Sequence, residues 1–169
     1  RTRRTRGARS EKPDAPYAVG RRSSSWLKMK HALDTLDCVI VGAEPGVGRR
    51  REQLCELTVA VRDDLSGRLA PLGRAGATLD EAGLSELSSW FEAHTLAQLG
   101  AYRSVEPRRV VEVAFDGIRR TEHSASGFSL RAPRVLRVRD DLGPDQVATL
   151  STVEQRFRAG SAQGDSDVA

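Results

Sequence analysis

Two short segments of the chain concentrate side chains that bind phosphate groups. The first is Tyr17–Lys30 (YAVGRRSSSWLKMK), in which two arginines and three serines precede Lys28 and Lys30. On a strand, alternation places both ammonium groups on one face, an arrangement that presents them to an anion such as a triphosphate. An exposed basic edge strand, which discourages aggregation, is an equally open interpretation of these residues.

The second segment is Phe128–Asp141 (FSLRAPRVLRVRDD), which holds four arginines within nine residues, at 131, 134, 137 and 139. Guanidinium groups offer planar, bidentate contacts to phosphate, and Pro133 fixes the backbone between two of them. The spacing predicts that Arg137 and Arg139 share one face of a strand. Asp140 and Asp141 either orient these arginines or neutralise them.

Two weaker basic sets lie in predicted loops. Arg49–Arg51 follow the turn-forming sequence Glu44–Gly48, and Arg119 and Arg120 follow Gly117. Loop arginines of this kind track a nucleic-acid backbone in some small β-barrels, although each set alone is also typical of a solvated turn.

Charge and composition limit the class of protein. The net charge is +4, and residues 1–30 hold ten Lys or Arg against two acids, so the basic end suggests contact with a polyanion. No apolar run approaches the roughly 20 residues that cross a membrane, and we expect a soluble, cytoplasmic protein. The sites of Cys38 and Cys55 in apolar stretches predict buried thiols, and the three histidines lack metal-ligand spacing.

The hydrophobic pattern predicts a mainly β domain that positions these arginines. Residues 1–16 lack any period and are expected to be disordered, as is the tail 159–169. Alternation predicts strands at 37–44, 54–61, 68–73, 110–115, 127–130 and 135–138. A three-to-four-residue period predicts helices over 80–99, capped by Thr78 or Asp80 and ended by Gly100, and over 148–157. Short strands with a helix after the third fit an OB-fold, a five-stranded Greek-key barrel.

Four segments together resemble the ATP-dependent DNA ligases, in the order that the family has them. They are YAVGRRSSSWLKMK, LDCVIVGAEPGVGRR, SSWFEAHTLAQLG and VVEVAFDGIRRTEHSASGFSLRAPRVLRVRDD. The first is similar to the end of the adenylation domain, and the last to the final ligase motif. The resemblance covers about residues 14–157. It implies a remnant of the adenylation domain at 17–33 and an OB-fold domain at 34–158.

The resemblance also implies a function and a role for each basic group. An enzyme of this family seals nicks in duplex DNA through an adenylated intermediate, with ATP and Mg²⁺. By position, Arg22, Lys28 and Lys30 would contact ATP, and the final-motif arginines, Arg131, Arg134, Arg137 and Arg139, the departing pyrophosphate. The DNA-binding residues would be Arg49, Arg50, Arg119 and Arg120. We expect a monomer, with an adenylation domain acting in cis or in trans.

The sequence departs from the family at three places. No Lys-x-Asp-Gly motif supplies a nucleophilic lysine, and no Glu-Gly-x-x-x-Lys motif precedes Asp14. The final motif continues Asp141–Leu142 where the family has Asp-Lys, and Ala132 stands in place of an aromatic residue. We therefore expect no catalytic residue and no metal ligand in this chain, and no self-adenylation. The alternative function is a stand-alone OB-fold module that binds nucleic acid without catalysis.

Overall fold

The computed structural model describes residues 5–11 and 26–164, with side chains described from residue 33 to residue 161. The chain divides into two compact units, Arg1–Leu33 and Asp34–Ala169. Each unit is described by itself.

The first unit contains an antiparallel pair of strands, β1 (Thr5–Glu11) and β2 (Trp26–Ala32). Arg9 lies opposite Lys28, and Gly7 lies opposite Lys30. β1 corrects the expectation of a disordered N-terminal segment for these seven residues. Ladder hydrogen bonds come from the backbone, so a polar segment without a hydrophobic period can still pair with a neighbouring strand.

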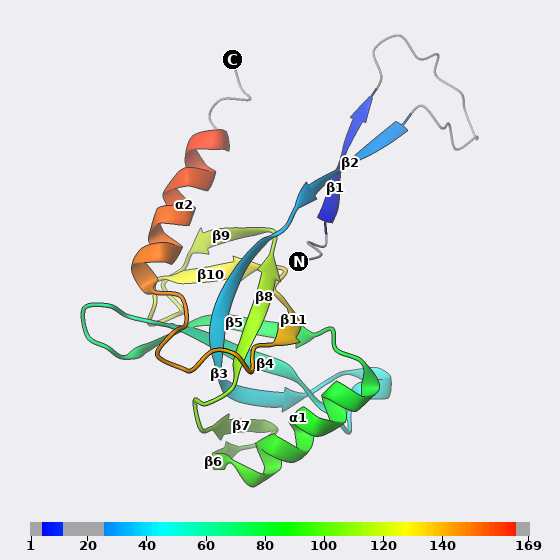
Figure 1. The fold of residues 1–169 in the computed structure, drawn as a ribbon, viewed down its shortest axis with the longest axis vertical. Helices are drawn as coiled ribbons and strands as arrows, with labels where there is room; N and C mark the ends of the chain where they lie inside the picture. The colour runs from blue at the N-terminus through cyan, green and yellow to red at the C-terminus, as the bar shows by residue number, and fades with distance from the viewer. Residues whose placement is uncertain (1–4, 12–25, 165–169) are drawn as a thin grey trace. The chain divides into compact units, whose positions relative to one another are not determined.

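The second unit is built on a closed five-stranded barrel (Figure 1). Around the barrel the strands run β3, β4, β5, β11, β8 and back to β3, and only the β5–β11 pair is parallel. The barrel strands are β3 (Asp34–Pro45), β4 (Leu54–Arg62), β5 (Leu69–Ala77), β8 (Val110–Phe115) and β11 (Arg134–Val138). This order is that of an OB-fold, which confirms the predicted fold class.

Strand β3 closes the barrel because it is long enough to serve two neighbours. Its first half, from Asp34 to Val39, pairs with β8, and its second half, from Val39 to Pro45, pairs with β4 across two irregularities in register. Inward-facing residues of all five strands form the core, and both cysteines lie in it as free thiols, as predicted. Burial, with a smaller effect of the Asp37 carboxylate, raises the pKa of Cys38 to about 12.

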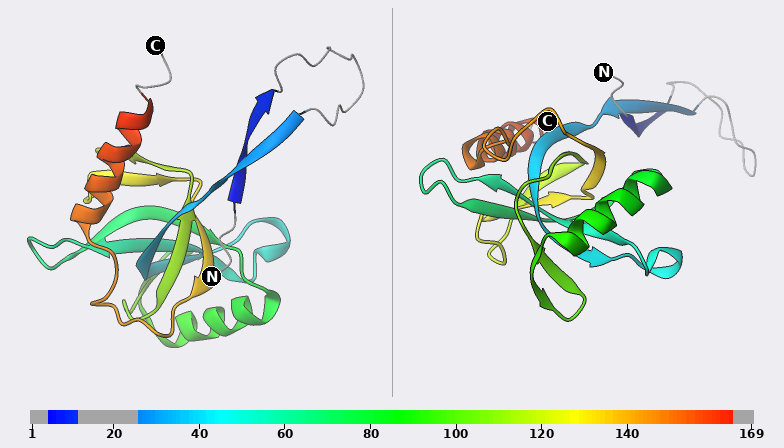
Figure 2. Two further views of the ribbon diagram at one scale, coloured as in Figure 1. Left: turned by 45° about the horizontal axis from the view of Figure 1, so that its top comes forward. Right: turned by 60° about the horizontal axis from the view of Figure 1, so that its bottom comes forward.

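Helix α1 (Glu81–Ala93) lies across one end of the barrel (Figures 1 and 2). Asp80 caps it, since its side chain accepts a hydrogen bond of 2.8 Å from the Gly83 N–H. Leu84, Leu87 and Phe91 recur at helical spacing and enter the core, so the predicted start and buried face are confirmed.

The predicted end of this helix is wrong. The helix stops at Ala93, and a hairpin follows, made of β6 (Thr95–Leu99) and β7 (Tyr102–Val105). Gly100 lies in its turn with φ +61°, a conformation that glycine adopts without strain, rather than at the end of the helix. Strand β7 joins the barrel by pairing with β3 at Gly42, where a Cβ would overlap the Tyr102 ring.

A second inserted hairpin, β9 (Gly117–Arg120) and β10 (Phe128–Arg131), connects β8 to β11. Helix α2 (Leu150–Gly164) lies beside it, and Phe157 packs against Phe128 with ring centroids 5.5 Å apart (Figure 2). The Asp64 carboxylate accepts hydrogen bonds from the first turn of α2 at Ser151. α2 runs past residue 158, where the sequence predicted a disordered tail, because Ala159, Ala162 and Gln163 continue a helix well. No helix among the described residues is long and apolar enough to cross a membrane.

Candidate nucleic-acid interface

The first basic set lies in a single turn at the end of β3. Gly48–Arg50 form a 3-10 helix, η1, which follows an exposed Val47. Arg50 donates from Nη1 to the Ala77 carbonyl oxygen at 3.2 Å, and Arg51 donates from Nε to the Gly48 carbonyl oxygen at 3.2 Å. The exposed Arg49 side chain has no partner among the described residues. Arg50 therefore also ties the turn to β5, whereas Arg49 is available to an anion.

The second basic set is placed by the β9–β10 hairpin, not by a loop as predicted. Register puts Arg119 opposite Ser129 and Arg120 opposite Phe128, so neighbouring arginines lie on opposite faces. The Arg120 guanidinium carbon lies 5.7 Å from the Phe128 ring centroid and 5.5 Å from that of Phe157. Such contacts contribute on the order of 0.5–1 kcal/mol at exposed sites. Arg120 thus helps to hold the hairpin against α2, and Arg119 is exposed on the other face.

Arg131 ends β10 opposite Gly117 and is exposed. None of the carboxylates in the described part of the chain lies within ion-pair distance of it. Ala132, which follows, has φ +46° and is the single non-glycine residue with positive φ in the described ranges. Backbone strain of this kind is often found at functional sites, and here it turns the chain from β10 into β11.

Arg134 and Arg137 of the final-motif set are paired with carboxylates. Arg134 Nη2 lies 3.3 Å from Asp116 Oδ1, and Arg137 Nε lies 2.6 Å from Glu112 Oε2. Arg137 and Glu112 are cross-strand neighbours on β11 and β8, which explains their contact. Burial would raise the pKa of Glu112, but hydrogen bonds from Arg137 and Thr35 outweigh it and lower that pKa.

Arg139 is buried and serves as a structural link. Nε and Nη2 both donate to the Asp141 carboxylate at 2.8 Å, and Nη1 donates to Asp37 Oδ1 on β3 at 2.9 Å. Its side chain is only 9% exposed, whereas that of Arg137 is 51% exposed. Strand β11 ends at Val138, so Arg139 lies just beyond the strand on which Arg137 pairs with Glu112. The bidentate contact lowers the pKa of Asp141 to about 2.

The predicted ATP-binding residues belong to the first unit. Lys28 and Lys30 are alternate positions of β2, so the predicted strand is confirmed at both. Arg22 lies outside the described residues.

Sequence reasoning missed a polar groove of about 270 Å³ beside α1, lined by Trp90, His94, Arg108, Arg109, Val110, Arg139, Asp140 and Leu142. His94 stacks on Trp90 with ring centroids 4.1 Å apart, and its Nδ1 lies 2.7 Å from the Trp90 carbonyl oxygen. Arg109 lies over the Trp90 ring and pairs with Asp140 at 3.0 Å. The i, i+4 spacing of the tryptophan and histidine was the available signal. Carboxylates already neutralise the arginines of this groove. We therefore interpret the groove as the packed end of helix α1 and not as a binding site.

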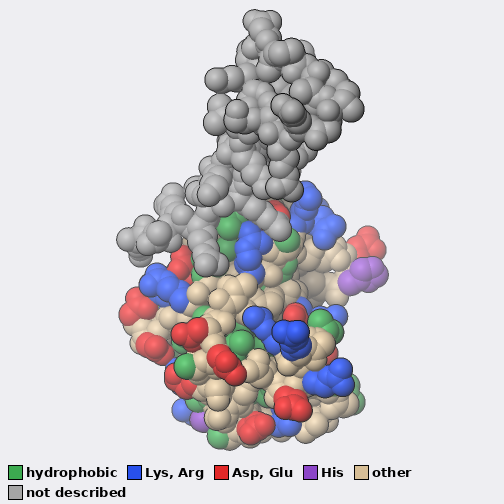
Figure 3. Space-filling model, turned by 90° about the vertical axis from the view of Figure 1, so that its right-hand side faces the viewer, with side chains coloured by type: hydrophobic (Ala, Val, Ile, Leu, Met, Phe, Trp, Pro, Cys, Tyr) green, Lys and Arg blue, Asp and Glu red, His purple; other side chains and the backbone are tan. Residues whose placement is uncertain are grey.

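The predicted arginines therefore fall into two groups, those without and those with a carboxylate partner among the described residues. Arg49, Arg119 and Arg131 lie without such partners around the barrel, and Arg134, Arg137 and Arg139 are balanced within the second unit. Figure 3 shows Lys and Arg side chains dispersed among acidic ones on one face, with no continuous basic patch in that view. Among the described residues no group of three or more His, Cys, Asp or Glu side chains is arranged to hold a metal ion.

A closed barrel with the strand order β3, β4, β5, β11, β8 and a helix after its third strand defines an OB-fold domain. Comparison with known proteins identifies the family. Residues 50–142 match the model of the ATP dependent DNA ligase C terminal region, and the chain belongs to this ligase family.

Its relatives are much longer proteins. A probable DNA ligase of Koribacter versatilis is 44% identical over 143 residues, which are 85% of this chain and 24% of that protein. The DNA ligase of Archaeoglobus fulgidus is 36% identical over 146 residues, or 86% of this chain and 26% of that protein. The chain thus spans about a quarter of the length of these relatives.

Solved structures show the same fold. The ligase domain of Mycobacterium tuberculosis LigD aligns with a TM-score of 0.54 and 27% identity, covering 85% of this chain and 47% of that one. A mycobacterial DNA ligase D complexed with ATP and MES aligns with a TM-score of 0.53 and 25% identity, covering 82% and 44%.

Proposed function

We propose that this chain supplies the DNA-backbone and ATP-phosphate contacts of an ATP-dependent ligase that seals nicks in duplex DNA in the cytoplasm. The supporting observation is a set of free arginines on an OB-fold barrel whose residues 50–142 match the ligase family. An adenylation domain, in cis or in trans, would supply the covalent lysyl-adenylate. Mg²⁺ would enter with ATP, because the described residues offer no cluster that holds a metal ion.

The duplex would be held by its phosphates. Arg49 and Arg119 are exposed and without partners in the described part of the chain, so neutralising a DNA phosphate disrupts no existing ion pair. Arg50 and Arg120 lie beside them and also hold the turn and the hairpin in place. In this proposal the first two contribute charge, and the other two contribute both charge and position.

The triphosphate would be held by the first unit. Lys28 and Lys30, at alternate positions of β2, and Arg22 would contact ATP, since an ammonium group is a mobile point charge suited to phosphate. These residues would bind and orient ATP through their positive charge. In this proposal the chain forms no covalent intermediate itself.

The final-motif arginines would differ in their readiness to bind pyrophosphate. Arg131 has no carboxylate partner in the described ranges and can bind an anion directly. Arg134 and Arg137 must first exchange Asp116 and Glu112 for phosphate, at a modest cost because the pairs are partly exposed. Arg139 remains with Asp37 and Asp141 and fixes the end of β11, the strand that carries Arg134 and Arg137.

One experiment tests whether this chain assists an adenylation domain in sealing a nick. The chain is mixed with an adenylation domain from a related ligase that lacks its own OB-fold domain, and sealing of a 5′-phosphorylated nick is measured. We expect sealing above that of the adenylation domain alone, and an Arg131→Gln variant to seal more slowly. Sealing that does not rise when the chain is added contradicts the proposal.

A second measurement concerns the chain by itself. Incubation with α-labelled ATP and Mg²⁺ should leave no acid-stable label, because residues 1–169 contain no Lys-x-Asp-Gly motif. A labelled protein band contradicts this expectation.

The alternative, a stand-alone OB-fold module, predicts binding to single strands by stacking of bases on aromatic side chains. Phe91, Phe115 and Phe128 are buried, and Trp90 stacks on His94. The structure thus offers few free stacking surfaces among its described aromatic residues, which favours the ligase role.

A further inference from the structure

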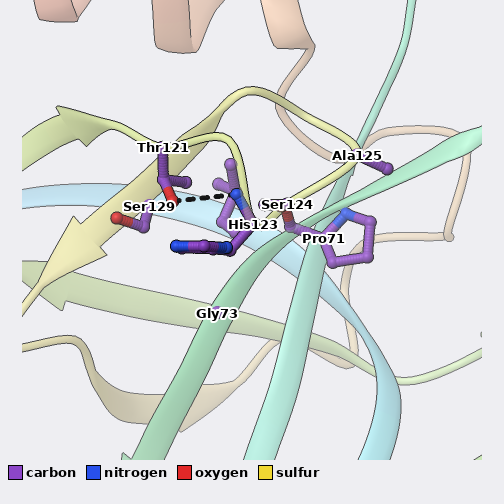
Figure 4. Close-up of a pocket in the computed structure, with 8 residues that line it drawn as sticks. Pro71, Gly73, Thr121, His123, Ser124, Ala125 and Ser129 are labelled. Carbon is purple, nitrogen blue, oxygen red and sulfur yellow. Dashed lines mark hydrogen bonds between the residues drawn. The ribbon is translucent and has the colours of Figure 1, made fainter.

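A cavity of about 330 Å³ lies between strand β5 and the segment that links β9 to β10 (Figure 4). Pro71, Leu72 and Gly73 form its β5 side. Its other wall is formed by Thr121, His123, Ser124, Ala125 and Ser129. This size is at the lower end of the range for small-molecule sites, and it suits one nucleotide unit better than a large ligand.

Strand β5 has a bulge where it lines the cavity. Val59 pairs with Gly73 and Ala60 pairs with Pro71, so Leu72 is an extra residue on β5. Gly73 has φ +117°, and a Cβ built there meets no atom within 4 Å, so backbone conformation rather than crowding requires glycine. Bulges often lie next to binding sites, because they redirect the strand.

The opposite wall is held in place by its own hydrogen bonds. Ser124 Oγ donates to the Pro71 carbonyl oxygen at 2.6 Å and lies 2.9 Å from Ser126 Oγ. Ser126 is buried and accepts a hydrogen bond from the Phe128 N–H at 3.1 Å. The linking segment is therefore fastened to β5, and the cavity beneath it is preformed.

Several polar groups at the cavity remain free to bind a ligand. Thr121 Oγ1 accepts from the His123 N–H at 3.2 Å but keeps its own hydroxyl proton to donate. Ser129 Oγ and the His123 ring have no hydrogen-bond partner among the described residues, and His123 is exposed. Figure 4 shows Thr121, His123 and Ser129 together on one side of the cavity, with Pro71 and Ala125 on the other.

Two free arginines share this face of the hairpin. Ser129 lines the cavity and lies opposite Arg119 in the β9–β10 register, and Arg131 lies opposite Gly117. Side chains of paired and alternate residues point to the same side of a hairpin, so Arg119 and Arg131 flank the cavity. Both are exposed and lack carboxylate partners in the described ranges.

We propose that this cavity binds one sugar–phosphate unit of a DNA strand. The apolar Pro71 and Ala125 contact the sugar, the Thr121 and Ser129 hydroxyls donate to phosphate oxygens, and Arg119 holds a neighbouring phosphate. The inference rests on the proposed function, because it takes DNA as the source of the sugar–phosphate unit. The β9–β10 hairpin would therefore contact DNA through this cavity as well as through its arginines.

The test measures affinity for a fluorescently labelled nicked duplex by anisotropy. Ser129→Ala removes one neutral donor, and Ala125→Leu fills the cavity without removing a hydrogen bond. Each should weaken binding about three- to tenfold, the range expected for one lost hydrogen bond or a blocked contact. Since neither changes the charge, the dependence of affinity on salt should stay that of the wild type. Ser85→Ala, an exposed position on α1, is the matched control and should bind as the wild type does.

The outcomes separate this inference from the proposed function. If Ser129→Ala and Ala125→Leu, with unchanged thermal unfolding, bind like the wild type while Arg119→Gln binds more weakly, the cavity site is wrong and the DNA-binding role stands. If the wild type does not bind nicked duplex at all, both are wrong. Thymidine 5′-monophosphate is titrated separately, with NMR shifts of the His123 and Ser129 amides as the readout. If thymidine 5′-monophosphate causes such shifts while Ser129→Ala and Ala125→Leu leave the affinity for nicked duplex unchanged, the assignment of the cavity to a DNA strand is wrong.

Discussion

The free and the tethered arginines should respond differently to loss of charge. In a double variant, Arg49→Gln with Arg119→Gln, two exposed guanidinium groups without partners in the described residues are lost. If each neutralises one phosphate, the slope of log affinity against log salt falls in magnitude by about 1.8. The ratio of wild-type to variant affinity should therefore shrink about 12-fold between roughly 50 and 200 mM salt. The thermal unfolding midpoint should not change.

The comparison variant is Arg50→Gln with Arg120→Gln. It removes equal charge, but it also removes the hydrogen bond to Ala77 and the contacts with Phe128 and Phe157. We expect a lower unfolding midpoint as well as weaker binding. Anisotropy titrations with nicked duplex at four salt concentrations, together with circular dichroism melts, measure both effects. A first double variant whose salt slope equals that of the wild type refutes the assignment of Arg49 and Arg119 to DNA phosphates.

Four further predictions follow from the geometry. Arg139→Gln should lower the unfolding midpoint measured by calorimetry, because it leaves Asp37 and Asp141 without their shared partner, and an unchanged midpoint contradicts the link. The pKa of Asp141 is lowered from 3.8 to about 2, so its stabilising effect is present above about pH 4 and is lost as the pH falls toward 2. Asp141→Asn should remove this part of the pH dependence of the free energy of unfolding. Phe91→Ala should reduce the free energy of unfolding by about 3–5 kcal/mol, because Phe91 is fully buried, whereas the exposed Ser89→Ala on the same helix should change it little in urea titrations. The thiol of Cys38 should react with a disulfide reagent at pH 8 only after denaturant is added, since its pKa is raised to about 12, and rapid reaction in the native protein contradicts its burial.

Much of the barrel was predictable because its strands alternate and its turns carry glycine, proline or aspartate. The start of α1 was predictable from Asp80, but its end was not. His94, Thr95 and Leu99 continue the helical spacing by coincidence, whereas Thr95 Oγ1 and His94 Nδ1 bond the Phe91 and Trp90 carbonyl oxygens and end the helix. The exposure of Leu99 in β6 shows that its periodicity did not reflect burial.

The basic residues were visible in the sequence, but their partners were not. Arg139 and Asp37 are 102 residues apart in the sequence. They come into contact because β3 and β11 both pair with β8 in the closed barrel. Composition therefore could not tell the buried link Arg139 from the free Arg131. The cavity at Gly73 was equally hidden, because its bulge arises from strand register, which the sequence pattern did not resolve.

Preference for a nick is the most direct test of the ligase account. Labelled nicked duplex bound to the full chain is competed with unlabelled nicked duplex, intact duplex of the same sequence, and the single strand. We predict that nicked duplex competes best and the single strand worst. Stronger competition by the single strand than by either duplex contradicts the account, and would identify the chain as a single-strand-binding module.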